Sequence, residues 1–312
     1  MTTIKDVARL AGYSPATVSR AINHSGYVSA AAAAKIQAVI AQLDYVPNDI
    51  ARDLSQGRTV NVGVVVPHLN HPYFTQVFNG ILTAAFAADY NVVLLQSKYD
   101  ADLERGYLEQ LHRKAFDALI FTSRAIPLAE LAAAQKYGPI ICCEDPGDYP
   151  LAAAYSQRTA AYQAAFRWIQ TQGYHHIGLT LSRSDKLSAT TRLTLATYAT
   201  IFGHAPDPDL VALGVTTFAD GYQAAQTWAA QASQPDFIFS NGDDIATGIR
   251  QFYLDHQLAV PPLMGQENQL SGRLLGLPTI DHHFQQVGAA AFHLAASRQV
   301  THVPVAAELI LR

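Results

Sequence analysis

The spacing of apolar residues divides this 312-residue chain into two parts. In residues 1–46, apolar positions recur at helical spacing in three short segments. From residue 60 onward, short continuous apolar runs alternate with longer amphipathic stretches. The first pattern predicts a small helical head, and the second predicts an α/β body.

The second helix of the head has the clearest signals. Ser14 is placed to accept a backbone N–H as the N-cap, and Pro15 follows at the first helical position, where its missing donor costs nothing. Val18 and Ile22 lie four residues apart and are expected to pack inward. The outward face then carries Pro15, Ala16, Ser19, Arg20 and Asn23. With the preceding helix near 4–11 and the turn at Gly12, this arrangement predicts a helix-turn-helix that enters a major groove of DNA.

Arg20 is the residue that we expect to read DNA sequence. Its planar donor fork matches the O6 and N7 acceptors of guanine. Ala16 is short enough to touch a thymine methyl group, while Ser19 and Asn23 suit phosphates. An isolated arginine is more often a solvated surface residue, and it is the helix-turn-helix context that favours DNA contact here.

A third helix and a hinge complete the amino-terminal part. Ser29 can cap the third helix, whose apolar stripe consists of Ile36, Val39, Ile40 and Leu43. Residues 44–47 break this helix, because the residue before a proline avoids the α region. The segment Asn48–Gly57 begins with a capping residue and ends with glycine, but it is too short to be a stable helix alone. We expect it to fold only with a partner chain and DNA.

The body pattern predicts two doubly wound lobes with parallel sheets. Strands are expected near 60–66, 91–96, 117–122 and 139–143, and then near 176–181, 236–240 and 260–265. Helices are expected near 73–89, 102–114, 127–137, 158–172, 189–202, 219–232 and 243–257. The chain as a whole is therefore expected to be an α/β protein with a three-helix head.

Ligands of open α/β sheets bind beyond the carboxyl ends of the strands, so polar residues there are candidate ligand contacts. These candidates are Asn70, Tyr73, Phe74, Ser123, Arg124, Asp145, Asn241, Asp243 and Glu267. They could hold a polyhydroxylated ligand, with Tyr73 or Phe74 stacking on an apolar ring face. An N-cap role explains Asn241 equally well, and a surface ion pair explains Arg124 equally well.

The head and hinge resemble the LacI/GalR family of bacterial repressors. The matching runs are Thr3–Ala8, Gly12–Arg20, Gly26–Ser29, Leu43–Asn48 and Ala51–Leu54. The resemblance implies a homodimer on a palindromic operator, under allosteric control by a small molecule or a partner protein. The DNA-contacting residues that we expect are Thr3, Ser14, Pro15, Ala16, Thr17, Ser19, Arg20, Asn23, Tyr45, Asn48, Ala51, Leu54 and Ser55.

The resemblance also implies roles for residues that spacing alone does not assign. Leu54 from each subunit would wedge into the minor groove and kink the operator, although a contact between hinge and body would also explain it. Ser55 stands where the family often has a basic residue. Arg192 lies near an arginine that contacts ligand in several relatives, although Leu195 replaces the usual glycine of that stretch. The body would resemble periplasmic binding proteins, with a last helix near 284–297 and a strand near 303–311 returning to the first lobe.

Within that family, the chain is most similar to the catabolite control protein B group. The matching runs are Tyr90–Leu95, Phe121–Ala125, Tyr137–Pro139 and Cys143–Asp148. This likeness implies carbohydrate-related or catabolite-controlled target genes and a sugar or phosphosugar effector. Some relatives also bind a phosphorylated carrier protein (phosphocarrier protein) of sugar uptake, but no residue pattern establishes that partner here.

Charge supports a division into a head at 1–46, a hinge and linker at 47–59 and a body at 60–312. Residues 1–60 carry six Lys or Arg and four acidic residues, a net charge of +2, so a total of −4 leaves −6 for the rest. Only the head is therefore suited to phosphate. The N-terminus has no signal-like apolar segment, which predicts a cytoplasmic protein that associates with the nucleoid through its operator and not with a membrane.

Two other functional classes were weighed. Asp281-His282-His283 invites a metal or phosphoesterase interpretation, and Ser182, Asp185 and His204 could be imagined as a triad. No metal-binding helix pair or thiolate cluster accompanies the histidines, and the adjacent Cys142 and Cys143 suit neither a disulfide nor a metal cage, so we expect no catalytic residue, metal or cofactor. An exported sugar-binding protein would have similar lobes, but it would lack the head.

Overall fold

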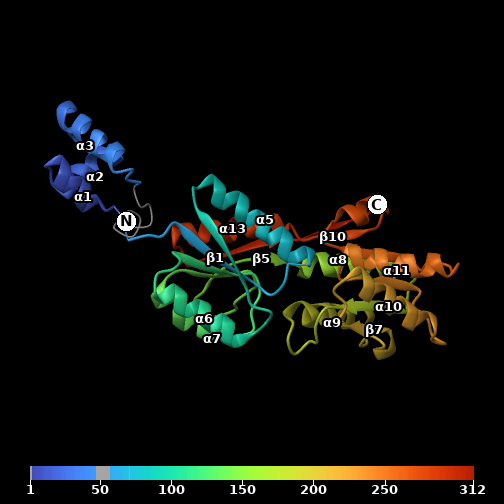
Figure 1. Cartoon of the computed structure of the whole chain (residues 1–312). Helices are drawn as coiled ribbons and strands as arrows, with labels where there is room; N and C mark the ends of the chain where they lie inside the picture. Colours follow the sequence, from blue (N-terminus) through green and yellow to red (C-terminus); the bar gives the residue numbers. More distant parts are fainter. Residues whose placement is uncertain (1, 47–56, 70) are drawn as a thin grey trace. The chain divides into compact units, whose positions relative to one another are not determined.

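The computed structural model describes residues 2–46, 57–69 and 71–312, which form two compact units, Met1–Thr59 and Val60–Arg312. The first unit, the head, contains α1 (Ile4–Ala11), α2 (Pro15–Asn23) and α3 (Ala30–Gln42), as the sequence predicts (Figure 1). Its small core consists of Val7, Ala8, Ala11, Val18, Ala21, Ile36 and Val39. The predicted hinge segment, 48–57, lies outside the described residues except for Gly57.

The second unit, the body, has two lobes. The sheet of lobe 1 has the order β11-β5-β4-β3-β1-β2, and all its pairings are parallel. Its strands are β1 (Asn61–Val66), β2 (Asn91–Gln96), β3 (Ala118–Phe121), β4 (Ile140–Cys142), β5 (Ala152–Gln157) and β11 (His302–Ala306). Its helices are α5 (Pro72–Ala87), α6 (Ala101–His112), α7 (Leu128–Ala134), the short η1 (Gln135–Tyr137) and α13 (Phe284–Ser297).

Lobe 2 repeats this plan with one antiparallel edge. Its sheet has the order β12-β10-β9-β8-β6-β7, and only β12 runs antiparallel to its neighbour. The strands are β6 (Ile177–Leu181), β7 (Val211–Leu213), β8 (Phe237–Phe239), β9 (Leu263–Gln266), β10 (Thr279–Asp281) and β12 (Glu308–Ile310). The helices are α8 (Thr159–Thr171), α9 (Ala189–Phe202), η2 (Pro208–Leu210), α10 (Phe218–Ala229), α11 (Asp243–Asp255) and α12 (Leu270–Leu274).

Apolar layers cover both faces of each sheet, which confirms the doubly wound architecture. In lobe 1, α5 and α13 pack on one face and α6 and α7 on the other (Figure 1). In lobe 2, α8 and α9 cover one face, and α10 and α11 cover the other. Both sheets therefore have buried cores on each side, as parallel sheets require.

The chain crosses between the lobes three times, which places both ends of each lobe near one another. The crossings follow β5, β10 and β11, at residue 158, at residues 282–283 and at residue 307. Two of these crossings lie in the last thirty-one residues of the chain, 282–312. The connection between the lobes is therefore completed only by the C-terminal segment. Among the described residues, no helix has the length and apolar character needed to cross a membrane.

Several expected element boundaries were wrong. The run at 91–96 is not a buried strand but the edge strand β2, with Asn91, Leu94 and Gln96 exposed. The single strand expected at 303–311 is two strands, β11 in lobe 1 and β12 in lobe 2. The strands β5, β7 and β10 and the short helix α12 were not predicted. β5 reads Ala-Ala-Ala-Tyr-Ser-Gln and β10 has three residues, so neither shows a recognisable strand pattern.

Candidate nucleic-acid interface and interlobe zone

The outward face of α2 is the candidate nucleic-acid interface. Ser14 Oγ accepts the Thr17 N–H at 3.1 Å, so the predicted N-cap is present. Val18 is fully buried on the inner side of this helix, and Ile22 packs against the same core. The predicted contact residues Pro15, Ala16, Arg20 and Asn23 are exposed, while Thr17 and Ser19 are half-buried. The inner and outer faces are therefore those predicted from the sequence.

Arg20 is a free cation on this face. Within the described part of the head, Arg20 has no carboxylate partner, whereas Arg9 pairs with Asp6 at 3.4 Å. Thr3 also contacts Asp6, donating its N–H at 3.1 Å and its hydroxyl at 2.7 Å. These hydrogen bonds from Thr3 lower the pKa of Asp6. Arg20 is consequently the cation of α2 that can form new charge-assisted hydrogen bonds.

Other predicted DNA contacts have structural partners or are not described. Thr3 serves the start of α1, and Tyr45 packs against the core of the head. Asn48, Ala51, Leu54 and Ser55 lie outside the described residues. Their DNA contacts stay predictions.

In the body, the interlobe zone comprises the carboxyl ends of the parallel strands of both lobes and the three crossings. Tyr73 lies at the carboxyl ends of β3 and β4. Its hydroxyl donates to the carbonyl of Thr122 at 2.7 Å and lies 3.4 Å from the carbonyl of Cys143. Burial raises the pKa of Tyr73 well above its usual value. Its ring packs edge-on against Phe74 at 4.8 Å and Phe284 at 4.7 Å. Tyr73 and the buried Phe74 thus tie α5 to the sheet, and stacking of either ring on a ligand stays a prediction.

Arg124 follows β3 and forms the ion pair that was one of its two expected roles. Its Nε lies 2.5 Å from Glu144 Oε1, and its Nη1 donates to the carbonyl of Ile126 at 2.8 Å. The buried carboxylate of Glu104 holds this loop by accepting the N–H groups of Ala125 and Ile126 at 2.8 and 3.1 Å. Ser123 is half-buried in the same loop, and the exposed Asp145 accepts the N–H of Gly147 at 2.9 Å.

The side chain of Asn241 connects neighbouring strands of lobe 2. Its Oδ1 accepts the hydroxyl of Thr180 at 2.6 Å, and its Nδ2 donates to the carbonyl of Val215 at 3.0 Å. The N-cap of α11 is Gly242, so the alternative N-cap role of Asn241 was wrong. These two hydrogen bonds position neighbouring strands and use half of the hydrogen-bonding capacity of the amide.

Asp243 is a buried structural carboxylate. It accepts the hydroxyl of Thr279 and the N–H of Gln269, each at 2.7 Å, which links α11 to β10 and to the start of α12. Burial raises its pKa to about 6. The structure gives Asp243 no exposed surface, so direct contact with a ligand would require this site to open.

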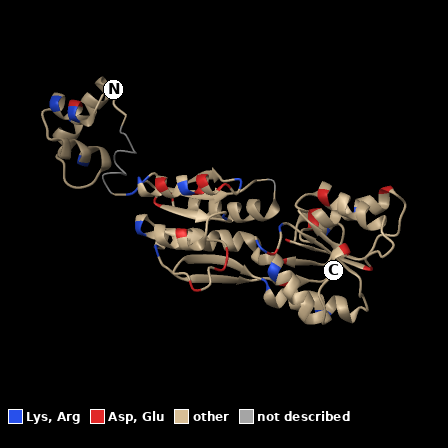
Figure 2. Ribbon diagram, turned by 90° about the horizontal axis from the view of Figure 1, so that it is seen from below, with Lys and Arg blue, Asp and Glu red and all other residues tan. Residues whose placement is uncertain are grey.

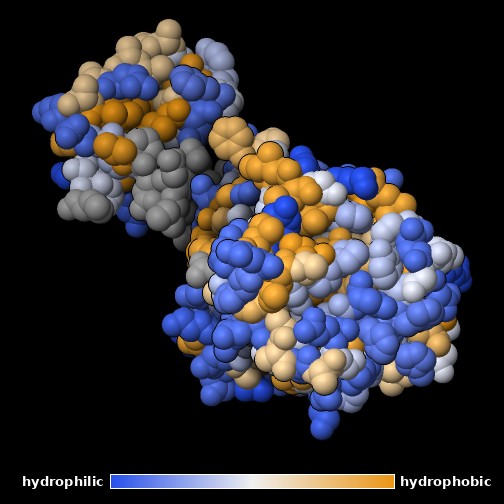
Figure 3. Space-filling view, turned by 90° about the vertical axis from the view of Figure 1, so that its right-hand side faces the viewer, coloured by the Kyte–Doolittle hydropathy of each residue, from blue (hydrophilic) through white to orange (hydrophobic). Residues whose placement is uncertain are grey.

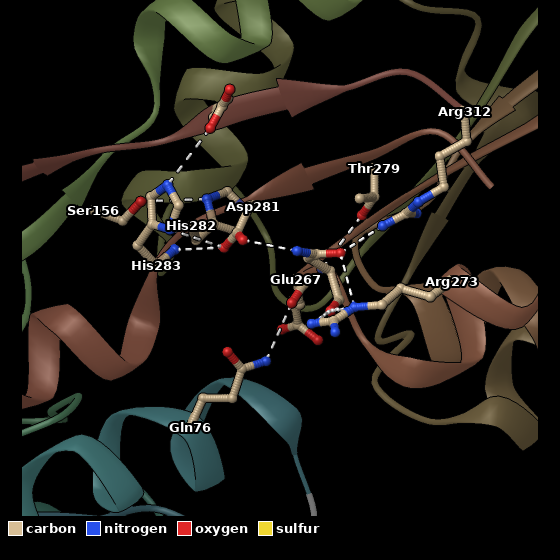
Figure 4. A network of polar contacts seen from close by, with 11 residues as sticks. Gln76, Ser156, Glu267, Arg273, Thr279, Asp281, His282, His283 and Arg312 are labelled. Atoms are coloured by element: carbon tan, nitrogen blue, oxygen red, sulfur yellow. Dashed lines mark hydrogen bonds and ion pairs between the residues drawn. The ribbon is translucent and has the colours of Figure 1, made fainter. Parts of the chain in front are cut away.

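Glu267 is a buried carboxyl group of the predicted set that lies on a strained backbone. It is 5% exposed, and its backbone has a φ of +86°, which is rare for any residue except glycine. Burial, reinforced by Asp243 and Asp244, raises its pKa well above the usual value. The backbone carbonyl of Glu267 accepts Gln76 Nε2 from lobe 1 at 3.2 Å (Figure 4). Strained residues held this firmly cluster at functional sites, which supports a ligand-linked role.

His71 faces Glu267 from lobe 1. The His71 Nδ1 lies 3.8 Å from Glu267 Oε1 and accepts the Tyr73 N–H at 3.2 Å, as the N-cap of α5. Burial lowers the pKa of His71 to about 4. The imidazole is therefore neutral near neutral pH, and this contact between lobes is not an ordinary ion pair.

A buried polar chain runs through the crossings. The ring of His282 contacts Ser156 Oγ at 3.3 Å and Gln266 Oε1 at 3.0 Å, and Tyr162 donates to the same Gln266 oxygen at 2.8 Å. Burial lowers the pKa of His282 well below its usual value. Figure 4 shows Ser156 and His282 side by side, near Asp281 and His283. His282 lies between β10 and α13, and its burial at this crossing was not predicted from the sequence.

Arg158, at the first crossing, was missed by the sequence analysis. Its guanidinium lies 5.7 Å from the ring centre of Phe284, and its Nε is buried without a hydrogen-bond partner in the part of the chain that the structure describes. Its charge acts to lower the pKa of Glu267. A cation directly after a strand is the signal that selected Arg124, but the strand before Arg158, β5, was itself not recognised.

A contact between the two lobes was also not predicted from the sequence. The guanidinium carbon of Arg183, which follows β6, lies 4.4 Å from the ring centre of Tyr99, which follows β2. This cation–π contact joins the two lobes directly. The predicted Arg192 is exposed on α9 and donates to the carbonyl of Asp185 at 2.6 Å. Asn70 lies outside the described residues.

The geometry gives no support to catalysis. Among the described residues, no group of three or more His, Cys, Asp or Glu side chains is placed to hold a metal ion. The ring of His204 contacts the neighbouring Ala205 carbonyl at 2.8 Å, and no hydrogen bond in the described part joins it to Ser182 or Asp185. Burial raises the pKa of Cys143 to about 12 and that of Cys142 still further, so both thiols stay protonated.

Comparison with known proteins matches two family models to two successive parts of the chain. Residues 3–48 match the family model of bacterial regulatory proteins of the lacI family, and residues 59–296 match that of periplasmic binding proteins and the sugar binding domain of the LacI family. The chain is 38% identical to catabolite control protein B of Bacillus subtilis (strain 168), over 94% of each chain. It is 29% identical to the ribose operon repressor of Escherichia coli (strain K12), over 84% of this chain and 80% of that protein.

The solved structures agree in fold. A crystal structure of the lac repressor dimer bound to operator and the anti-inducer ONPF superposes with a TM-score of 0.83 at 21% identity, covering 100% of this chain and 98% of that one. A LacI-family regulator from Silicibacter pomeroyi gives a TM-score of 0.79 at 24% identity, with the same coverage. At these identities the likeness concerns the fold.

Proposed function

Because this chain belongs to the LacI family of bacterial transcription regulators, we propose that it represses carbohydrate-related or catabolite-controlled genes as a homodimer on a palindromic operator. The observation that carries the proposal is the exposed face of α2, with its unpaired Arg20, on a head that matches the lacI-family model. Residues 1–46 are the proposed DNA-binding domain, 47–59 the hinge and 60–312 the effector-binding and dimerisation domain. Such a protein acts in the cytoplasm, at operators on the nucleoid.

The proposed DNA contacts are divided by groove. Arg20 reads a guanine in the major groove, and Ala16, Ser19 and Asn23 contact neighbouring groups. Thr3, Ser14, Pro15, Thr17, Tyr45, Asn48, Ala51 and Ser55 support or extend this contact. Leu54 from each subunit enters the minor groove at the centre of the operator and bends it.

The proposed dimer surface lies on α5 and α12. Leu82 and Phe86 are exposed on α5, Phe86 by 84%, and Leu270 and Leu274 are exposed on α12 by 69% and 76%. A groove between the two helices is lined by residues from both, including Asn79 and Leu270. In the face of the body shown in Figure 3, hydrophobic residues gather toward the top, while hydrophilic residues cover most of the rest. A two-fold axis through such a surface would present two heads to inverted half-sites.

The interlobe zone is the proposed effector site. Arg158, which lacks a hydrogen-bond partner on its Nε, and Glu267, which is strained, are the groups that a sugar or phosphosugar would engage. Ser123, Arg124, Asp145 and Arg192 lie on the surrounding loops and helices, and with Asn70, Tyr73, Phe74, Asn241 and Asp243 they complete the proposed set. The ligand would favour one angle between the lobes and thereby form or melt the hinge helices, with a coupling of about 1–3 kcal/mol. A phosphorylated carrier protein of sugar uptake is a further proposed coregulator.

The experiment that tests operator binding is selection from random DNA by the full-length protein. We expect recovered sequences to share an inverted repeat, with a binding stoichiometry of two chains per duplex. A variant in which Phe86 and Leu274 are replaced by Asp should weaken operator binding by disrupting the dimer, and the matched change Leu103→Asp, at an exposed position on α6, should not. Recovery of no common sequence at moderate salt, with glucose 6-phosphate present or absent, would contradict the proposal.

A further inference from the structure

A second concave site lies in lobe 1, at the end of the sheet where β4 and β5 begin. It is a cavity of about 370 Å³. Its lining comes from four segments that are far apart in sequence, namely Lys114, Gln135–Ile140, Ala152 and Arg298–Val300. The interlobe zone is at the opposite ends of these strands, so the two sites are separate. Small-ligand pockets commonly have volumes of about 300–1,000 Å³.

The cavity is positively charged throughout. Lys114, Lys136 and Arg298 line it, and none of its lining residues is acidic. Residues 61–312 have a net charge of −6, from the total of −4 and the +2 of residues 1–60, so this cluster runs against the charge of the body. Figure 2 shows blue ribbon at the end of lobe 1 where β1 begins. Such a local excess of positive charge favours an anion.

The three cations retain capacity for a ligand. Lys114 Nζ donates to the carbonyl of Tyr137 at 2.6 Å, which leaves two of its three protons, and Lys136 Nζ lies 5.0 Å from the ring centre of Tyr137. Within the described residues, none of the three has an acidic partner within 4.0 Å. By contrast, Arg105 on α6 and Arg113, the residue after it, are paired with carboxylates at 2.9 and 3.1 Å. The cavity cations are thus the unpaired ones of this region.

Stabilisation of helix ends does not account for this charge. Lys114 and Arg298 follow the last turns of α6 and α13, where cations interact favourably with the helix dipole. Each helix end carries only about half a negative charge. Two such ends leave most of the three positive charges uncompensated, which is the charge that a dianion would neutralise.

We propose that this cavity binds the phosphate group of a phosphorylated small molecule. A phosphate monoester has close to two negative charges and three terminal oxygens, which suits three cations from separate segments better than a carboxylate does. The concave shape and limited volume select a metabolite-sized ligand. Gly138 lines the cavity, a Cβ on it would lie 3.5 Å from the Asp117 carbonyl, and the Asp117 side chain accepts the N–H of Val60 at 3.0 Å. A bound phosphate would therefore sit close to the start of the body, after the linker.

The test is calorimetric titration of the full-length protein with glucose 6-phosphate and, separately, with inorganic phosphate. We expect both probes to bind, and Lys136→Gln and Arg298→Gln each to weaken binding about tenfold, the value of one charge-assisted hydrogen bond. Arg167→Gln, which removes an exposed cation of lobe 2, is the matched control and should change nothing. Arg158→Gln is titrated with inorganic phosphate in parallel, because it reports on anion binding in the interlobe zone and not in the cavity.

Three results would overturn the proposal. The first is no binding of either probe to the wild-type protein at millimolar concentration. Loss of phosphate binding in Arg158→Gln, with retention in the two cavity variants, would assign the anion to the interlobe zone. Lower melting temperatures of the cavity variants with unchanged affinity would limit these cations to stabilising helix ends. Operator binding without phosphate, measured on the same variants, separates this proposal from that of DNA recognition.

Discussion

The head and the interlobe zone hold their polar side chains in opposite ways. In the head, the polar contacts join residues three or four positions apart, such as Ser14 with Thr17 and Ser19 with Asn23. In the interlobe zone, Gln76 bonds Glu267 across 191 positions of sequence, and Ser156 contacts His282 across 126. Among the described residues of the head, the side-chain hydrogen bonds are local and the apolar core joins the three helices, whereas the interlobe zone exists only when both lobes are complete.

The same contrast appears in the carboxylates. Asp6 is on the surface of the head, and hydrogen bonds from Thr3 lower its pKa. Glu267 is buried between the lobes, and burial raises its pKa well above the usual value. An exposed capping carboxylate favours its charged form, while a buried one is penalised for it. Asp6 therefore stays charged at neutral pH, whereas burial between the lobes opposes the charged form of Glu267.

The largest expected effect is a loss of stability of the body that leaves the head unchanged. A Cβ at Gly288 of α13 would lie 2.0 Å from the Val77 carbonyl of α5, so Gly288→Val should destabilise the body by about 3 kcal/mol. Both tryptophans, Trp168 and Trp228, are in the body, so denaturant unfolding followed by their fluorescence measures this change. Gly106→Ala, at a helical position with open space, is the control and should not destabilise. An equal loss of head helicity would show that the two units are not independent.

Next in size is the loss of Arg20, the cation of α2. Arg20→Ala should weaken operator binding by about 1–3 kcal/mol and relax the preference at one base of each half-site. Arg9→Ala removes another exposed cation, one that is paired with Asp6, and should leave base preference unchanged. Selection from randomised sites measures both. An unchanged preference in Arg20→Ala would refute its assigned role.

Mild acidification should test the interlobe zone through His71. Since the pKa of His71 is lowered from 6.5 to about 4, the unfolded chain binds a proton that the folded body excludes between these values. His71 therefore costs no stability above its unfolded pKa, and about 2 kcal/mol at about pH 5.

The variant His71→Asn isolates this cost, because asparagine can keep the N-cap of α5 without titrating. On acidification from about pH 7 to about pH 5, the variant should lose less stability than the wild type, by about 2 kcal/mol. His204→Asn, at an exposed position in lobe 2, is the control. Parallel pH profiles of wild type and His71→Asn would contradict the burial of His71 between the lobes.

The smallest expected effect concerns the direct bridge between lobes. Tyr99→Leu removes the ring that lies 4.4 Å from Arg183, at a cost of about 0.5–1 kcal/mol to the closed arrangement. Hydrogen exchange should become faster in the loops after β2 and β6 and stay unchanged in the head. The exposed Tyr149 offers a matched control in Tyr149→Leu. No change in hydrogen exchange at these loops would show that the contact between Arg183 and Tyr99 does not stabilise the arrangement of the two lobes.

The sequence by itself determined the head, the alternation of strands and helices, and the outward face of α2. Those features depend on caps such as Ser14 and on apolar spacing such as that of Val18 and Ile22, which act within one or two helical turns. Tertiary structure decided the interlobe chemistry. It paired Arg124 with Glu144, used the amide of Asn241 to brace strands, and left Arg158 without a hydrogen-bond partner on Nε after an alanine-rich strand. The first two outcomes depend on neighbouring strands within one lobe, and the third depends on a crossing between the lobes. A local sequence pattern carries no information about such distant partners.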